Sequence, residues 1–400
     1  MKPSSAPPRV GFITYDLQEF TADCLARIAE RMPGRLKAYP LFDRVDAATL
    51  PFQFEPSTKK GRFFAVRRKG STPEGFTSSI NLRAAIRSVL ENDVVVLFGL
   101  QGATVIVAAT LARLLRRKVV SVNQTLPLEY EARRRWWVRG LKQYVLGLCQ
   151  WHVVQSPAST EVLTRIYGAS SNRLVMAPFE GGATLMKERM QTLRPRRDAL
   201  RQEHGWSENM CVFIFVGTLL QFKGTRTMIE AFARARHGGV DARLLLVGPA
   251  AAQPREPSLD DYRRMATELR VAQDVSVLGR KNLDELAALY VASDVLVLPT
   301  NKDTWGKVIA EAAMAGLPHI TTSACGAIGA IVEDKRTGRV VEPGNVDDLA
   351  RAMIEMSDKE IRTRCGREAE RLCLDWCDPV SEALGYTRAI TQAWAGAGAT

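Results

Sequence analysis

The chain has 400 residues, 46% of them hydrophobic and 24% charged. That length is too great for one hydrophobic core, and the composition is that of a globular protein, not a disordered one. The formal charge is +12, and residues 1–190 carry all of it, with 28 Lys and Arg against 15 Asp and Glu. Such an excess predicts an anionic partner for the first half: a membrane surface, an anionic glycan, a lipid phosphate or nucleic acid.

In the first half, short β-branched runs alternate with amphipathic stretches. We expect strands at 9–14, 93–98, 118–122 and 151–155, and helices at 21–31 and 159–167. Alternating strands and helices form a parallel sheet covered on both faces. The uncharged stretch 94–112 fits a strand, a turn and a helix better than a membrane span, because Gly and Gln interrupt it. No basic-then-apolar leader precedes the first strand, so we expect a cytoplasmic location, peripheral to the inner face of the cell membrane if the first half binds lipid.

The second half repeats the alternation after a charged, helix-prone segment at 185–203. We expect strands at 211–217, 243–248, 275–278, 295–299 and 318–321, and helices at 225–236, 260–270, 283–292, 305–315 and 346–356. The sequence therefore predicts an α/β protein with two doubly wound, Rossmann-like domains. Their expected ranges are 1–190 and 205–375, and we expect a helix within 376–400 to pack back on the first domain.

Two loops that follow expected strands carry residues suited to an anionic ligand. In the first loop, Gly217 and Gly224 allow a close approach of backbone, and Lys223 can reach a phosphate beside a helix N-terminus. In the second, Asp303 precedes a helix that begins near Gly306, where free N–H groups can hold an anion. For Lys223 a solvated side chain is the alternative, and for Asp303 an N-cap.

Together these segments resemble the C-terminal half of the retaining GT-B glycosyltransferases of family 4. The resemblance runs in order through Gly217…Lys223-Gly224, 244–248, 277–280, 292–299, Asp303-x7-Glu311-Ala312, Gly316-Leu317-Pro318, and Thr337-Gly338-x4-Pro343-Gly344. It implies two domains that face each other across a cleft, with acceptor binding in the first and nucleotide-sugar binding in the second.

The resemblance also implies a role for individual residues. Lys223 would hold the donor diphosphate, Glu311 the ribose and Asp303 the donor sugar, while Asn123 would lie near the acceptor. The implied donor site comprises Gly217, Thr218, Lys223, Gly248, Gly279, Arg280, Lys281, Gly306, Lys307 and Glu311, with Asp303 and Asn123 as catalytic residues. In the family's usual mechanism the leaving phosphate helps to deprotonate the acceptor, so we expect neither a metal nor a cofactor beyond a UDP- or GDP-sugar donor.

Three positions depart from the family pattern. Asp303 stands where Glu is usual, Thr218 where Arg is common, and Asn123 where many relatives carry His. Asn123 can form hydrogen bonds but cannot act as an acid or base near neutral pH. These departures put the identity of the donor sugar and the activity itself in question.

The most distinctive segment of the first half is 131–139, where arginines flank Trp136 and Trp137. Such a helix suits the surface of an anionic membrane. Alternatively, the tryptophans pack inward and the arginines are solvated. The basic run 67–69 fits both interpretations.

From the sequence we therefore predict a retaining, metal-independent glycosyltransferase. Its acceptor would be a glycan or a lipid-linked glycan in bacterial surface polysaccharide or lipopolysaccharide assembly. A nucleotide-sugar epimerase and a non-catalytic nucleotide-sugar-binding protein are the alternatives. No nucleic-acid recognition module is present, so we expect no nucleic-acid partner.

Overall fold

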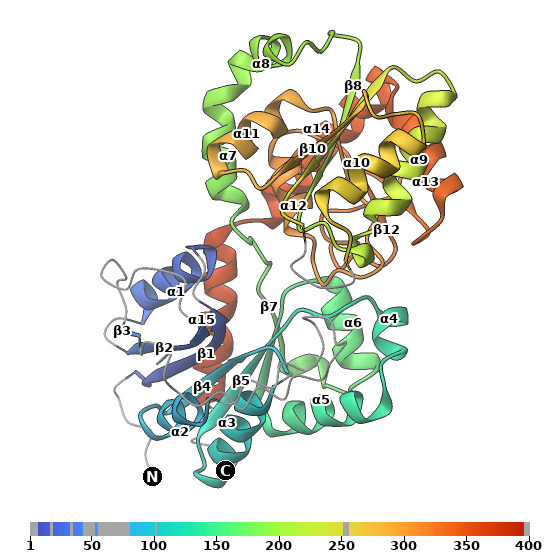
Figure 1. The fold of residues 1–400 in the computed structure, drawn as a ribbon. Helices are drawn as coiled ribbons and strands as arrows, with labels where there is room; N and C mark the ends of the chain where they lie inside the picture. Colours follow the sequence, from blue (N-terminus) through green and yellow to red (C-terminus); the bar gives the residue numbers. More distant parts are fainter. Residues whose placement is uncertain are drawn as a thin grey trace. The chain divides into compact units, whose positions relative to one another are not determined.

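The computed structural model describes residues 7–16, 19–32, 35–42, 53–54, 81–100, 102–250 and 256–395. It divides the chain into two compact units, and each is a parallel sheet with helices on its faces (Figure 1). The first unit consists of Met1–Phe179 and Asp378–Thr400, and the second of Glu180–Cys377. The predicted fold class, α/β with two doubly wound sheets, is confirmed.

The first unit has a seven-stranded sheet in the order β3-β2-β1-β4-β5-β6-β7, and every neighbouring pair is parallel. The chain builds outward from β1 in one direction and then from β4 in the other, as in doubly wound folds. Its strands are β1 Val10–Asp16, β2 Leu36–Phe42, β3 Gln53–Phe54, β4 Val94–Phe98, β5 Lys118–Asn123, β6 Trp151–Val154 and β7 Leu174–Met176.

Helices cover both faces of this sheet because its strands are apolar on both sides. Val94 and Val96 belong to one buried cluster, and Val95 and Leu97 to the other, as the period of two in a strand requires. The helices are α1 Glu19–Arg31 and α15 Pro379–Ala395 on the first face, α2 Leu82–Leu90, α3 Ala103–Leu114, α5 Trp136–Leu148 and α6 Pro157–Arg165 on the second, and the short α4 Leu128–Ala132.

Two sequence predictions are tested directly in this unit. In the uncharged stretch 94–112, residues 94–98 form β4 and residues 103–112 form most of α3, as expected. No helix among the described residues combines the length and apolarity that crossing a bilayer requires.

The second unit has a six-stranded sheet in the order β10-β9-β8-β11-β12-β13, again parallel throughout. Its strands are β8 Cys211–Val216, β9 Ala242–Val247, β10 Val275–Gly279, β11 Val295–Leu298, β12 His319–Thr322 and β13 Gly338–Val341. Its helices are α7 Ala183–Leu193, α8 Arg197–Glu203, α9 Thr225–His237, α10 Leu259–Glu268, α11 Leu283–Ala292, α12 Lys307–Met314, α13 Val346–Met356 and α14 Lys359–Trp376.

A buried ion cluster closes the amino ends of β8 and β11. The Asp294 carboxylate accepts hydrogen bonds from Arg197 (2.7 Å), Arg201 (2.8 Å) and the Val212 backbone N–H (2.8 Å). Arg362 of α14 lies 3.7 Å from the same carboxylate. This cluster ties α8 and α14 to the start of the sheet, so Asp294 has a structural role.

Candidate functional site

The strand order of the second unit reverses between β8 and β11, which are hydrogen-bonded neighbours. In doubly wound sheets, ligands bind beyond the carboxyl ends of the strands at such a reversal. The two loops that the sequence singled out, 217–224 after β8 and 299–306 after β11, both start there. Their backbones are in contact, because the Asn301 N–H donates to the Phe222 carbonyl at 2.7 Å.

Glycine is required where these loops approach one another. A Cβ at Gly224, which has a φ of 75°, would lie 2.0 Å from the Pro299 carbonyl oxygen. A Cβ at Gly248 would lie 1.9 Å from the Gly217 carbonyl oxygen. Gly248 also donates its N–H to Gly279 at 2.8 Å. Three of the predicted donor-site glycines, Gly217, Gly248 and Gly279, therefore lie at the ends of adjacent strands β8, β9 and β10.

The structure brings Lys223 and Asp303 into direct contact. The Lys223 Nζ lies 2.5 Å from the Asp303 Oδ2. The exposed fractions of the Lys223 and Asp303 side chains are 21% and 14%, so a ligand can still reach them. The residue predicted to hold the diphosphate and the residue predicted to meet the sugar are thus partners across the two loops.

Asp303 is held in place by its own loop and by the segment that follows β12. Its backbone N–H donates to Ala324 at 3.0 Å, and its carbonyl accepts from Gly326 at 2.9 Å. Its Oδ1 accepts from the N–H groups of Trp305 (3.2 Å) and Gly306 (3.0 Å). Because these bonds occupy one oxygen, only Oδ2 faces Lys223.

These contacts revise two details of the sequence interpretation. The N-cap of α12 is Gly306, with a φ of 82°, and not Asp303. Asp303 instead binds the turn just before the helix. The Gly306 N–H, which was expected to contact phosphate, already donates to Asp303. An anion at this helix would therefore have to meet other amides of its first turn.

Glu311 lies on α12, partly buried, one turn beyond Lys307. The Tyr290 hydroxyl of α11 donates to its Oε2 at 2.9 Å. Loss of solvation raises the pKa of Glu311; the Tyr290 hydrogen bond and the Lys307 charge act against that rise, and the Glu180 charge adds to it. Loss of solvation, with the adjacent Glu311 charge, also raises the pKa of Tyr290 well above its usual value.

Sequence reasoning missed two of these neighbours, Tyr290 and Glu180. Tyr290 lies on an apolar face of α11 and reads as a core residue. Glu180 accepts the N–H groups of Gly182 (2.7 Å) and Thr184 and so caps the start of α7. Glu180 is the first residue of the second unit, so this contact ties the start of that unit to α7.

The remaining predicted donor residues lie near the same sheet edge, in more exposed positions. Thr218 and Arg280 are exposed, after β8 and β10 respectively. Lys281 pairs with Glu285 at 2.9 Å, and Glu285 completes a capping box with Asn282 at the start of α11. Local helix capping thus already engages Lys281, and the roles of these residues toward a ligand remain predictions.

Asn123 lies at the carboxyl end of β5 in the first unit and is only 2% exposed. Its Nδ2 donates to Ser121 Oγ and to the Val153 carbonyl, both at 3.0 Å. Its Oδ1 is buried and has no hydrogen-bond partner among the described residues. Ser121 also contacts His152 Nδ1 at 2.8 Å, and burial lowers the pKa of His152 to about 4.

The tryptophans of the 131–139 segment face outward. Trp136 is 83% exposed and Trp137 40% exposed, so the alternative in which they pack inward is wrong. Glu131 is the buried residue of this segment and accepts from Lys142 (2.5 Å) and Tyr167 (2.7 Å). The basic run 67–69 lies outside the described residues.

Within the part of the chain that the structure describes, no group of three or more His, Cys, Asp and Glu side chains is placed to hold a metal ion. The β8–β11 edge presents Lys223 and Lys307, the carboxylates of Asp303 and Glu311, and backbone amides. This set can bind an anionic group beside a polar, hydroxyl-rich one.

Comparison with known proteins agrees with this geometry. Residues 196–372 match the family described as glycosyl transferases group 1. The chain is 29% identical over 244 residues to D-inositol 3-phosphate glycosyltransferase of Corynebacterium aurimucosum, which covers 61% of this chain and 56% of that protein. It is 31% identical over 214 residues to the enzyme of the same name from Rhodococcus opacus, covering 52% and 46% respectively. The chain thus matches about half the length of these relatives.

Solved structures establish the fold over nearly the whole chain. Anabaena Alr3699/HepE in complex with UDP superimposes with a TM-score of 0.71 at 17% identity, covering 96% of this chain and all of that one. WaaG, a glycosyltransferase involved in lipopolysaccharide biosynthesis, gives 0.64 at 19% identity, covering 96% and 99%. The fold is therefore GT-B. The family match covers residues 196–372, most of the second unit, so the second unit resembles the glycosyl transferases group 1.

Proposed function

We propose that this protein transfers a sugar from a nucleoside-diphosphate sugar to a hydroxyl group of a glycan or lipid-linked acceptor. The observation that carries the proposal is the Lys223–Asp303 pair at the β8–β11 edge. Relatives named as glycosyltransferases and a fold neighbour solved with UDP and with UDP-glucose support it. By likeness to WaaG, a glycosyltransferase involved in lipopolysaccharide biosynthesis, a bacterial surface polysaccharide or lipopolysaccharide is the proposed product.

Each residue of the site has a distinct proposed role. Lys223 leaves Asp303 Oδ2 for the donor diphosphate, since a phosphate offers it more negative charge than one carboxylate does. The freed Asp303 oxygen then accepts a hydrogen bond from a donor-sugar hydroxyl. Glu311, held by Tyr290, accepts hydrogen bonds from the ribose, and Arg280 and Lys281 flank the base.

The proposed reaction retains the anomeric configuration and uses no metal. The bond between the anomeric carbon and the diphosphate oxygen breaks, and a bond to the acceptor oxygen forms on the same face. The acceptor proton passes to the leaving diphosphate. Lys223 and the amides that begin α12 stabilise the negative charge that develops there.

We also propose contact of the first unit with an anionic membrane through α5. The exposed Trp136 and Tyr144 lie on this helix, and Tyr144 OH contacts Thr110 of α3 at 3.0 Å. Leu114, 73% exposed, ends α3. Aromatic and aliphatic side chains beside arginines suit a lipid interface. Trp136→Ala should lower cosedimentation with phosphatidylglycerol vesicles, whereas Leu283→Ala, an exposed leucine of the second unit, should not; equal cosedimentation of both variants would contradict this contact.

The activity is tested by incubating the protein with UDP- and GDP-sugars and acceptor glycans, with and without EDTA. We expect release of nucleoside diphosphate and glycosylated product, unaffected by EDTA and lost in Lys223→Ala. Interconversion of the sugar without transfer would identify an epimerase instead. Binding without turnover would identify a sensor, and a strict metal requirement would contradict the proposed mechanism.

A further inference from the structure

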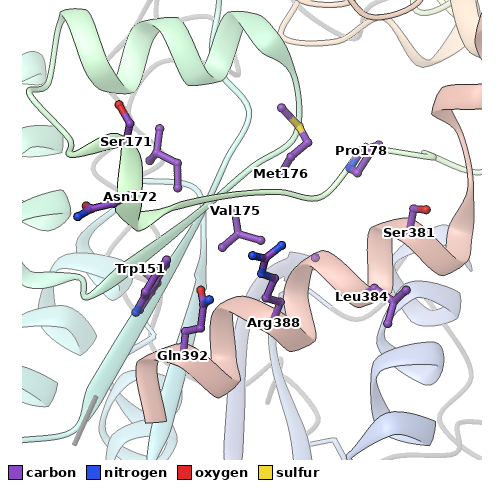
Figure 2. A pocket seen from close by; sticks show the side chains of 12 residues that line it. Trp151, Ser171, Asn172, Val175, Met176, Pro178, Ser381, Leu384, Arg388 and Gln392 are labelled. Atoms are coloured by element: carbon purple, nitrogen blue, oxygen red, sulfur yellow. The ribbon is translucent and has the colours of Figure 1, made fainter. Parts of the chain in front are cut away.

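Two adjoining hollows lie on the first unit, and none of the predicted donor-site residues lines them. One, of about 580 Å³, lies between the edge strand β7 and α15 (Figure 2). The other, of about 550 Å³, lies where β5 and β6 begin. Trp151 and Gln392 line both hollows, so the two adjoin at these side chains. We call the pair of hollows the Trp151 groove.

Polar side chains with unused hydrogen-bonding capacity surround the tryptophan. Figure 2 shows Arg388 and Gln392 rising from α15 toward β7, with Trp151 beside Gln392. Asn172 lines the same hollow. Among the described residues, these four side chains have no hydrogen-bond or ion-pair partner, and the Gln392 Oε1 is buried without one. Amides and a guanidinium around an aromatic ring match a sugar, which offers hydroxyl groups at its rim and apolar C–H groups on its face.

The charge of the groove is positive throughout. Arg113, Lys118 and Arg173 line the second hollow, and Arg388 lines the first. None of the four is in an ion pair with another described residue, and no Asp or Glu is among the lining residues. Unpaired cations in a concave surface attract an anion, so the ligand carries negative charge.

One part of the groove lies away from the expected edge of transfer. Arg113, Lys118, Trp151 and Arg173 lie at the amino edge of the sheet, whereas ligands that react in doubly wound folds lie at the carboxyl edge. Met176 and Pro178, which line the first hollow, lie at the carboxyl end of β7. From Ser381 to Gln392, α15 runs along the groove for about 16 Å, which is enough for a few linked sugars. A membrane would require protruding apolar side chains, and single-stranded nucleic acid would require successive stacking rings; the groove is recessed and has one.

We propose that the Trp151 groove binds a short anionic oligosaccharide whose acidic groups are carboxylates or phosphates. Trp151 supports a sugar ring, Asn172 and Gln392 bind hydroxyl groups, and Arg113, Lys118, Arg173 and Arg388 neutralise the acidic groups. The groove would hold the part of a glycan acceptor that lies away from the reacting end. Only this assignment to the acceptor rests on the proposed function; the binding itself does not.

The test is calorimetric titration of the full chain, without nucleotide, with tetragalacturonate, its fully methyl-esterified form and tripolyphosphate. We expect tetragalacturonate to bind most tightly of the three, and its affinity to fall as salt is added. Arg388→Ala and Asn172→Ala, both exposed positions, should each lower its affinity about 10-fold. Trp151→Leu keeps the apolar packing and should lower it similarly. Arg83→Ala, an exposed arginine of α2 in the same unit, is the matched control and should have no effect.

The outcomes separate this inference from the proposed function. If tetragalacturonate fails to bind, or binds all variants equally, the groove is not a glycan site, even where nucleotide binding is normal. If tripolyphosphate or a single-stranded oligonucleotide of equal charge binds more tightly, the glycan assignment is wrong. If tetragalacturonate binds in a Trp151-dependent manner but no nucleotide-sugar is used, the groove stands and the proposed transferase activity fails.

Discussion

The two edges of the second sheet each carry a carboxylate, and the two carboxylates differ in the number of their partners and in their accessibility. At the amino edge, Asp294 receives hydrogen bonds from Arg197, Arg201 and the Val212 N–H, and Arg201 is only 4% exposed. At the carboxyl edge, the outer oxygen of Asp303 has one charged partner, Lys223, and both side chains remain accessible.

The difference separates a structural ion cluster from a binding site. Taking Asp294 out of water is favourable only because several donors satisfy it at once. The Lys223–Asp303 pair lies between two loops, so an incoming phosphate can take the lysine at little cost. Both carboxylates lie in segments that resemble the same family, and only their surroundings distinguish their roles.

The largest expected effect is a loss of stability when Asp294, at the amino edge of the second sheet, is replaced. Asp294→Ala would leave Arg197, Arg201 and Arg362 without their shared carboxylate, which typically costs about 3–5 kcal/mol of unfolding free energy. Denaturant titration should show this loss, with normal nucleotide affinity in the protein that remains folded. Asp347→Ala breaks the exposed pair with Arg234 and should cost less than about 1 kcal/mol. Equal effects would contradict the contrast between the edges.

At the carboxyl edge, Lys223→Ala should have the opposite result: weaker nucleotide binding with little change in stability. Loss of a charge-assisted phosphate contact costs about 1.5–3 kcal/mol of binding free energy, or about 10- to 150-fold in nucleotide affinity. Stability should change little, because the pair is partly exposed. Lys359→Ala, from the exposed pair with Glu208, is the control and should leave affinity unchanged. A destabilised Lys223→Ala protein with normal affinity would place Lys223 among the structural residues.

The dependence of stability on pH tests another buried residue of the second sheet, His319. His319 of β12 is fully buried, and burial lowers its pKa to about 3. Between pH 6.5 and about 3 the unfolded chain therefore binds a proton that the folded chain does not, so stability falls as the pH falls. From pH 7 to 5 this amounts to about 2 kcal/mol. His319→Gln should remove that part of the loss in unfolding titrations at the two pH values; an unchanged pH dependence would show that His319 does not cause it.

The smallest expected effect concerns Tyr290. Tyr290→Phe removes one hydrogen bond to Glu311, worth about 0.5–1.5 kcal/mol, so nucleotide affinity should fall about 2- to 10-fold. Because that bond lowers the Glu311 pKa, its loss should raise the pKa further. Loss of binding on acidification should then begin at a higher pH than in the wild type. A pH profile of binding that matches the wild type would exclude a role for Glu311 as an ionised acceptor.

Sequence reasoning located the loops of the site because strong patterns flank them. The buried runs of β8 and β11 are apolar throughout, so the positions at which they end, and hence Lys223 and Asp303, could be predicted. The Lys223–Asp303 contact could not, because the two residues are 80 positions apart and meet only through the pairing of β8 with β11. The Tyr290–Glu311 bond joins two helices and leaves no local signal.

The sequence prediction omitted four strands, β2, β3, β7 and β13. β3, β7 and β13 have two, three and four residues, too few to show a period. β2 has seven residues but contains Pro40, which argues against a strand inside a sheet. β13 forms where it does because Gly338, with a φ of 152°, lets the chain pass His319; a Cβ there would lie 1.8 Å from the His319 carbonyl oxygen. The exposure of Trp136 could not be predicted from the sequence either, because an arginine-rich helix with two tryptophans can place them on the surface or in the core.

The central claim is that Lys223 and Asp303 divide the donor between them, one holding the diphosphate and the other the sugar. The most direct test titrates wild type, Lys223→Ala and Asp303→Asn with whichever of UDP and GDP stabilises the wild type, and measures sugar transfer on the same samples. In Asp303→Asn, the amide oxygen can still accept from Trp305 and Gly306, so the loop is preserved while Lys223 loses a competitor. We predict that Lys223→Ala binds the nucleotide at least about 10-fold more weakly. Asp303→Asn should bind it as tightly as the wild type or more tightly, yet transfer sugar poorly. Normal transfer by Asp303→Asn, or wild-type affinity in Lys223→Ala, would contradict the account.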